Sequence, residues 1–154
     1  MSTVPLPVYS FLDYNCELNG PGGSVSLGSY AGDAEEGVSI EAVEDANLPK
    51  FGADGTPMHS LNPVTASKIT VRLLKTSPTN ALLMQMFNYQ RSSALYWAQN
   101  IMSMRHNVTG DSITATGVAF QRVPPLTYAK EAGTIEWEFI AGYCDTILGE
   151  GITV

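Results

Sequence analysis

The sequence predicts a mainly β fold: a β-barrel or β-sandwich with one flanking α-helix. Three observations carry this prediction. Several segments alternate apolar and polar residues, which is typical of strands with one buried face. Fourteen glycines and nine prolines are spread along the 154 residues, so they indicate turns between strands and not a disordered tract. One segment, after the clearest strand, has the spacing of an amphipathic helix.

The first three strands are predicted from alternation around glycine-containing turns. Residues 9–18 alternate, and the NGPGG turn after them predicts a hairpin with residues 24–28. Residues 37–45 form the next predicted strand. The residues expected to face inward in these strands are Leu12, Tyr14, Cys16, Leu18, Val38, Ile40 and Ala42.

The segment at about residues 46–61 is expected to project as a hairpin or long loop. Asp54-Gly55 is a turn signal, and the arms that flank it contain prolines. Proline lacks an N–H, so in sheets it is confined to edges and strand starts. The whole chain, residues 1–154, is expected to form a single domain, because this length suits one hydrophobic core.

Residues 67–75 form the clearest strand, and a helix is predicted directly after it. Ser77 suits an N-cap, and Pro78 suits the first helical turn, where a missing N–H costs no hydrogen bond. The helix should end near residues 91–93, and Gln90 shares its apolar face. The expected helix–sheet core comprises Ile69, Val71, Leu73, Leu82, Leu83, Met86, Phe87 and Trp137.

The remaining predicted strands are residues 99–108, 112–120 and 134–143. A turn at about residues 107–111 should join the first two as a hairpin. In the last strand, alternation places Ile135, Trp137, Phe139 and Ala141 inward.

The charge balance disfavours a nucleic-acid-binding surface. The chain has 8 basic and 15 acidic residues, a formal net charge of −7, whereas such surfaces neutralise phosphates with Lys and Arg. No run approaches the ~20 apolar residues of a membrane span. The start, MSTVPLPVYSF, lacks the basic and apolar regions of a secretory signal. For Cys16 and Cys144, buried free thiols are favoured over a disulfide.

Side chains that could form a catalytic, metal or cofactor site are not grouped by any motif. His59 and His106 have no carboxylate or cysteine at ligand spacing. The acidic pairs at residues 35–36 and 44–45 lack the alternating oxygen ligands of a calcium loop, which favours solvated surface charge. No nucleophile elbow or phosphate-binding glycine-lysine loop occurs. We therefore expect a protein that is not an enzyme and has no metal or cofactor.

Six segments, in the same order, resemble the tail tube proteins of contractile-tailed bacteriophages. They are YSFLDYNCELNGPGGSVSLGS, AEEGVSIE, GADGTPMHSL, VRLLKTSPTNALL, GDSITATGVAF and LTYAKEAGTIEWEF. The group concerned is the phage structural-protein family with a KTSP-x-N segment after a long strand, and the resemblance spans about residues 9–149. It implies a tail-tube domain that closes into a ring when the sheets of neighbouring subunits pair.

The resemblance also implies a function and partners. Hexameric rings of this chain would stack into the inner tail tube, and DNA would pass through the lumen into the host without specific binding. The implied partners are tail sheath, baseplate and tape-measure proteins, with no membrane anchoring by this chain. The implied location is the virion tail, assembled in the bacterial host cytoplasm. Two alternatives stay open: the tube of a related contractile injection system, and a monomeric ligand- or carbohydrate-binding β-sandwich.

Two surfaces are assigned under this resemblance. The projecting segment is expected to contact a neighbouring subunit, in the adjacent ring, through Phe51, Asp54, Gly55, Met58 and His59. The lumen should lack a dense basic stripe, since unpaired Lys and Arg would bind DNA and retard it. If the face with Lys68 and Arg72 lines the bore, acidic neighbours should pair with both. The candidate lumen-lining residues are Ser39, Glu41, Thr70, Ser112, Thr114, Thr116, Glu136 and Glu138.

Overall fold

The computed structural model describes residues 8–28 and 33–150, and within these ranges the chain is mainly β-strand with one α-helix. The predicted fold class is therefore confirmed. The elements are η1 Phe11–Asp13 (a 3-10 helix), β1 Tyr14–Gly20, β2 Gly23–Ser26, β3 Asp33–Ala42, β4 Lys50–Phe51, β5 Pro57–Met58, β6 Ser67–Leu74, α1 Thr79–Arg91, β7 Asn100–His106, β8 Asp111–Phe120 and β9 Thr134–Ile147.

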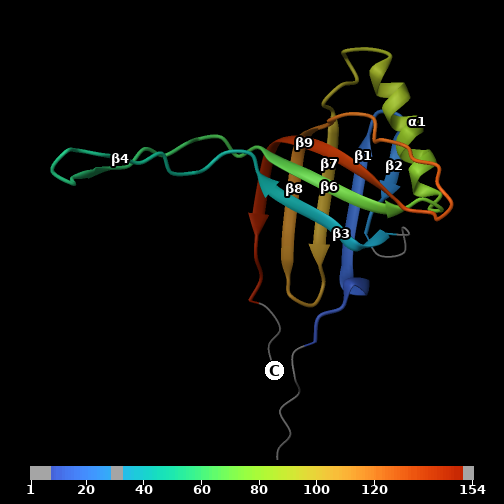
Figure 1. Ribbon diagram of the computed structural model, residues 1–154, viewed down its shortest axis with the longest axis horizontal. Coiled ribbons are helices and arrows are strands. Elements are labelled where there is room, and N and C mark those ends of the chain that lie inside the picture. The colour runs from blue at the N-terminus through green and yellow to red at the C-terminus, as the bar shows by residue number, and fades with distance from the viewer. Residues whose placement is uncertain (1–7, 29–32, 151–154) are drawn as a thin grey trace, which may run out of the picture.

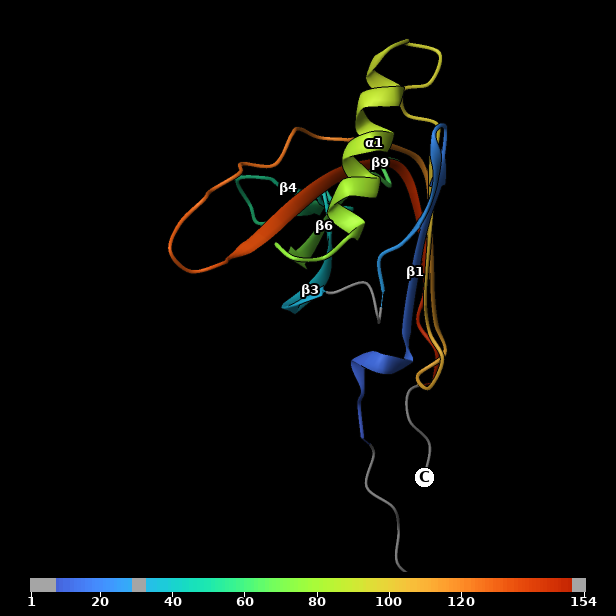
Figure 2. The same cartoon turned by 90° about the vertical axis from the view of Figure 1, so that its right-hand side faces the viewer.

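Seven strands form one antiparallel sheet in the order β2-β1-β7-β8-β9-β6-β3, while β4 and β5 form a separate two-stranded ladder. The large sheet curls into a half-barrel (Figures 1 and 2). Strand β9 carries the curl, because its first half pairs with β6 and its second half pairs with β8. The curl places β3 and β6 across from β1, β7 and β8, and the core fills the space between these two layers.

A pair of glycines marks the bend between the layers. Gly117 of β8 has a φ of 62° and lies against the backbone of Gly142 of β9. Before this point, the buried residue of β8 is Ala115, which has an odd number. After it, Val118 and Phe120 are buried, so the inward-facing positions have shifted by one residue. A left-handed residue in a strand produces this one-residue shift, and glycine adopts it without a Cβ clash.

Helix α1 packs a buried stripe against the inner face of the sheet. Leu83, Met86 and Phe87 are at most 5% exposed. The Phe87 ring meets Phe120 edge-on at 5.4 Å, and Phe120 in turn meets Trp137 at 6.0 Å. On the strands, Ile69, Val71, Leu73 and Trp137 are also buried, so all the expected core residues except Leu82 lie inside.

Three expectations for inward-facing residues are wrong. Leu82 is 47% exposed, because the buried stripe of α1 covers about 100° of the helix and Leu82 lies about 40° beyond its edge. Leu12 is 61% exposed, because it falls in the 3-10 helix η1 and not in a strand. Ala42 is exposed, because β3 ends there and the chain leaves the sheet.

The KTSP-x-N segment forms the joint between β6 and α1. The residue at the N-cap position is Pro78 and not Ser77, although the Ser77 hydroxyl accepts a hydrogen bond from the Thr79 N–H at 3.3 Å. Asn80 uses both ends of its amide: Nδ2 donates to the Leu74 carbonyl at 2.9 Å, and Oδ1 accepts from the Trp137 indole N–H at 3.0 Å. This amide thus satisfies the one polar atom of the largest buried side chain.

A buried pair of amides ties the other end of the helix to the sheet. Gln90 and Asn100 are fully buried and exchange two hydrogen bonds, at 2.7 and 2.9 Å. Their remaining N–H groups donate to the carbonyls of Pro21 and Val118. A Cβ on Gly20 would lie 1.8 Å from Asn100 Oδ1, so the glycine of the β1–β2 turn leaves room for this network. Since every amide group is paired, the network fixes where α1 sits.

Candidate assembly surfaces

Residues 46–62 form an arm that leaves the body of the molecule (Figure 1). Two-stranded pairing runs along it: Lys50 pairs with Met58, Phe51 with Pro57, and Asn47 with Leu61. All three pairs share one register, so the arm is a single hairpin without a bulge between them. The prolines lie on this free-standing ladder, where no central-strand N–H is needed.

The tip of the arm is closed by its own hydrogen bonds. The Gly52 N–H donates to the Thr56 carbonyl, and the Gly55 N–H donates to the Gly52 carbonyl. Gly55 has a φ of 88°, which explains glycine at this position. The Thr56 backbone N–H, which donates to the Asp54 carboxylate at 3.1 Å, lowers the pKa of Asp54 from its ordinary value.

The described body of the same chain leaves the arm exposed. Every residue from 41 to 61 is exposed. The large apolar side chains of the arm are exposed by between 52% and 86%. They are Leu48, Phe51, Met58 and Leu61. His59, also assigned to this surface, is exposed and hydrogen-bonds through Nδ1 to Asn47 at 3.1 Å. An exposed apolar surface of this kind is typical of a protein–protein contact.

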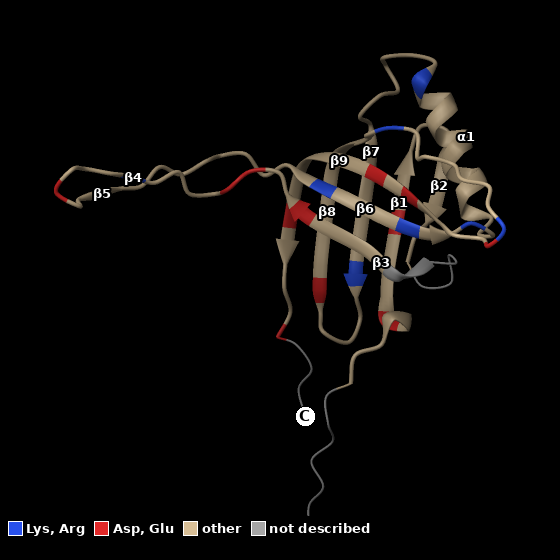
Figure 3. Ribbon diagram, in the orientation of Figure 1, with Lys and Arg blue, Asp and Glu red and all other residues tan. Residues whose placement is uncertain are grey.

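The outer face of β3, β6 and β9 carries ion pairs (Figure 3). Lys68 pairs with Glu138 at 3.3 Å, and Arg72 pairs with Glu136 at 3.5 Å. Arg122, from the connection after β8, also reaches Glu138, at 3.0 Å. Strand register explains the first two pairs, since Lys68 and Arg72 lie beside residues 140, 138 and 136 of β9.

Two hydroxyl residues, Ser39 and Thr70, lie on the same outer face as these ion pairs. Ser39 lies opposite Thr70, which in turn lies opposite Glu138. The Ser39 hydroxyl accepts a hydrogen bond from the Arg72 guanidinium at 2.8 Å. Thr70 is 9% exposed because the longer side chains beside it cover it, so it contributes little surface. Glu41 lies opposite Lys68 and is exposed.

The expected lumen residues divide between two surfaces. Ser112, Thr114 and Thr116 lie on β8, where Ser112 and Thr114 are exposed. Strand β8 belongs to the layer with β1 and β7, whereas the ion-paired face belongs to the layer with β3 and β6. Because the core separates these layers, their outer faces point away from each other (Figure 2). A single bore can therefore be lined by one set only. Alternation could not reveal this division, because it gives the face of a residue but not the layer of its strand.

The described residues contain little that could support chemistry. Among described side chains, which exclude those of Glu35 and Glu36, no group of three or more His, Cys, Asp or Glu could hold a metal ion. His106 is 4% exposed, and its Nδ1 accepts from the Thr109 N–H while Nε2 donates to the Ser10 carbonyl. Neither cysteine forms a disulfide; Cys16 is buried as expected, whereas Cys144 is only partly buried. In the described ranges no helix is long and apolar enough to span a membrane.

Three solved structures have similar folds. The anti-feeding prophage tube-terminating cap matches with a TM-score of 0.54 at 11% identity, over 97% of this chain and 96% of that chain. The sheath–tube complex of the extracellular contractile injection system PVC, in its extended state, matches with 0.53 at 13% identity, over 94% and 92%. The PVC sheath/tube terminator matches with 0.51 at 12% identity, over 96% and 99%.

At these identities the likeness shows a shared fold, that of tube and tube-terminator proteins of contractile injection systems. The sequence then defines the family. The chain belongs to the Bacteriophage PhiTE tail tube protein family, whose profile matches residues 6–149. No protein of curated function matches the chain. The family consists of structural tail tube proteins of phage virions and not of enzymes, so the protein is a tube subunit.

Proposed function

We propose that six copies of this chain, as one tail-tube domain each, form a ring, and that stacked rings form the inner tube of a contractile phage tail. DNA passes through this tube into the host. The observation that carries the proposal is the arm, whose apolar side chains lie in water although those of the helix–sheet core are buried. Through Phe51, Asp54, Gly55, Met58 and His59, the arm contacts a neighbouring copy in the adjacent ring.

The ends of the large sheet supply a second means of assembly. Strands β2 and β3 are its two edges, and among the described residues each is paired on one side only. Unpaired edge groups invite another strand, which is a hazard for a monomer and a joint for an oligomer. A head-to-tail contact between edges of different copies closes a ring when its rotation allows.

The bore of the tube is lined by one of the two polar outer faces. On the face of β3, β6 and β9, each described cation has an acidic partner, as a lining that does not retain DNA requires. The face of β8 presents hydroxyls instead. Helix α1 packs on the inner, apolar side of the sheet in either case, so it supports the lining without reaching it.

The proposed role in a phage tail implies further protein partners. One structural neighbour is part of a sheath–tube complex, which supports a tail sheath around the tube proposed here. Baseplate and tape-measure proteins complete the set of partners, and assembly takes place in the host cytoplasm before the tube joins the virion.

Two other functions fit less well. The tube of a contractile injection system shares the fold, but the family match is to a phage tail tube. A monomeric ligand-binding sandwich gives no role to the arm, whose apolar side chains are exposed in the single chain.

Negative-stain microscopy of the purified protein tests the proposal. We expect rings or tubes from the natural chain, and folded particles without long tubes after deletion of residues 51–57. Replacing Phe51, Met58 and Leu61 by serine keeps the length of the arm and should block tubes in the same way. Dispersed monomers from the natural chain would contradict the function, and normal tubes from the deletion would contradict the role of the arm.

A further inference from the structure

The arm and an apolar cavity are two different surfaces of the molecule. In Figure 1 the arm leaves one side of the half-barrel, near the ends of β3 and β6. Figure 2 views the opposite side, where β1 and β3 stand on either side of the near face with α1 above them. The cavity lies between these elements, because its lining comes from the start of β1, from β3 and from the β7–β8 end.

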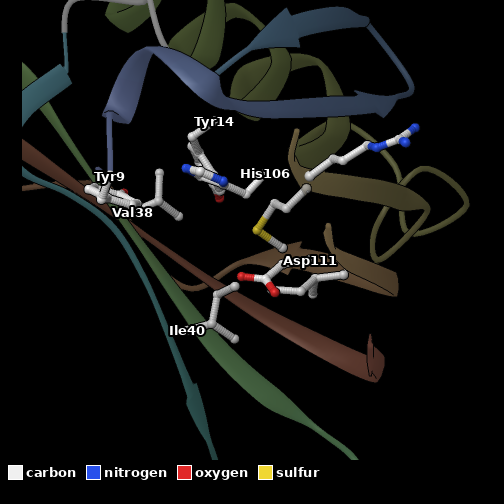
Figure 4. Close-up of a pocket in the computed structure, with 9 residues that line it drawn as sticks. Tyr9, Tyr14, Val38, Ile40, His106 and Asp111 are labelled. Carbon is white, nitrogen blue, oxygen red and sulfur yellow. The ribbon is translucent and has the colours of Figure 1, made fainter. Parts of the chain in front are cut away.

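Apolar side chains from both layers line this cavity (Figure 4). Val38 and Ile40 of β3 face Met104 of β7 and Ile113 of β8, and Tyr9 stacks on His106 at its mouth with ring centroids 5.0 Å apart. Val38, Ile40 and Ile113 pack against the core but stay partly exposed. Among the described residues, these side chains at the edge of the core are thus left partly uncovered.

The arm presents two different faces to a partner. Pairs Phe51–Pro57 and Asn47–Leu61 are four residues apart along the hairpin, so their side chains share a face. Lys50–Met58 is shifted by one residue and lies on the other face. Phe51 and Leu61, exposed by 69% and 86%, therefore share one face with Pro57 and with the intervening residues Pro49 and His59, while Lys50 lies on the other face.

The length of the arm and the volume of the cavity are also compatible with a contact between two copies. At about 3.3 Å per residue, the run from Ala46 to Gly55 spans about 30 Å, while the five neighbouring strands of one layer span about 20–25 Å. The arm can therefore cross a face of the next subunit. A cavity of about 220 Å³ has room for one or two large apolar side chains.

We propose that the Phe51–Leu61 face of the arm packs over the cavity lined by Val38, Ile40 and Ile113 in a second copy of the chain. The inference rests on the proposed tube and names the surface that receives the arm. Because the arm and the cavity are different surfaces of one chain, the contact is head-to-tail, and its repetition links each copy to the next. The arm of one copy then covers the partly exposed apolar side chains that line the cavity of its neighbour.

Mixed cross-linking tests this contact. In a Cys144→Ser background, copies with Phe51→Cys are mixed with copies carrying Tyr9→Cys, a residue at the mouth of the cavity that is 65% exposed. After assembly, a short bis-maleimide should give covalent dimers in the mixture and none with either variant alone. Lys50→Cys is the matched control, since it sits beside Phe51 on the other face, and it should cross-link at least fivefold less.

Two further variants keep the test decisive. If Phe51→Cys itself prevents assembly, Leu61→Cys probes the same face, and Val38→Trp fills the cavity and should stop assembly without unfolding the protein. Normal tubes without cross-links from Phe51→Cys or Leu61→Cys, equal cross-linking from Lys50→Cys, or normal tubes from Val38→Trp would each overturn the contact while leaving the tube intact. Absence of rings and tubes from the natural chain would overturn the tube, and the contact with it.

Discussion

The helix–sheet core and the arm use the same kinds of apolar side chain, yet the chain covers one set and leaves the other in water. Phe87 of α1 is 5% exposed, whereas Phe51 of the arm is 69% exposed. Burying a side chain of this size is worth about 1.5–3 kcal/mol. The core gains this free energy on folding. The apolar side chains of the arm gain this free energy only when another copy covers them during assembly. Folding and assembly therefore depend on different residues of one chain.

Truncating the core should give the largest effect on folding. Phe87→Ala removes a ring that packs on Phe120 and Trp97, so the free energy of unfolding should fall by about 3–5 kcal/mol, measured in urea. Leu73→Ala should cost about 2–5 kcal/mol for the same reason. Leu82→Ala on the exposed side of the helix is the control. Losses below about 0.5 kcal/mol at both Leu73 and Phe87 would contradict the packing.

Breaking the buried amide pair should have the next largest effect. Gln90→Ala leaves the Asn100 amide without its partner in a fully buried site, which should cost about 1–3 kcal/mol in thermal or urea unfolding. Gln99→Ala, on an exposed residue close by, should change stability by less than about 0.5 kcal/mol. Equal small losses from both variants would show that the network does not hold the helix.

Truncating the arm should separate assembly from folding. Phe51→Ala and Leu61→Ala together remove apolar surface that no part of the same body covers, so unfolding should change by less than about 0.5 kcal/mol. Tube formation, followed by sedimentation and microscopy, should be lost. A marked drop in monomer stability would mean that the arm belongs to the core after all.

Lysine substitutions should reveal which polar face lines the bore. Ser112→Lys with Thr114→Lys adds positive charge to one outer face, and Glu136→Lys with Glu138→Lys adds it to the other, where it also breaks ion pairs. The pair that lines the lumen should leave assembly intact and slow DNA release, more at low salt than at high salt. Normal release from both pairs at both salt concentrations would refute the electrostatic account of the lumen.

The smallest expected effect is at the tip of the arm. The folded pKa of Asp54 is lowered by the Thr56 N–H, so the carboxylate supports the turn above the unfolded pKa and loses this role as pH falls through the folded pKa. The protection of the Thr56 amide against hydrogen exchange, taken relative to the intrinsic rate at each pH, should therefore fall in acid, with no change in global unfolding. Asp54→Asn keeps an acceptor oxygen and should remove this acid dependence; Asp54→Ala should give low protection at every pH.

Much of the fold follows from local patterns. Alternation predicted the buried faces of β6 and β9, and the spacing after Ser77 predicted α1 to within a few residues. Local patterns did not predict burial correctly where it depends on which neighbouring element covers the residue. Leu82 fits an apolar helical face, but the sheet covers only part of that face, so its side chain stays in solvent.

By itself, the sequence determined which segments become strands, where the helix lies and that Asp54-Gly55 turns an arm, because these depend on side-chain period and local backbone preference. It also carried the family resemblance. Only the tertiary structure decided that the hydroxyls of β8 and the carboxylates of β9 lie on outer faces that point apart, since the Gly117–Gly142 bend and the split pairing of β9 set the layers. The same curl opens the cavity between β3 and the strands β1, β7 and β8, because strands distant in sequence meet there and no local pattern records their distance.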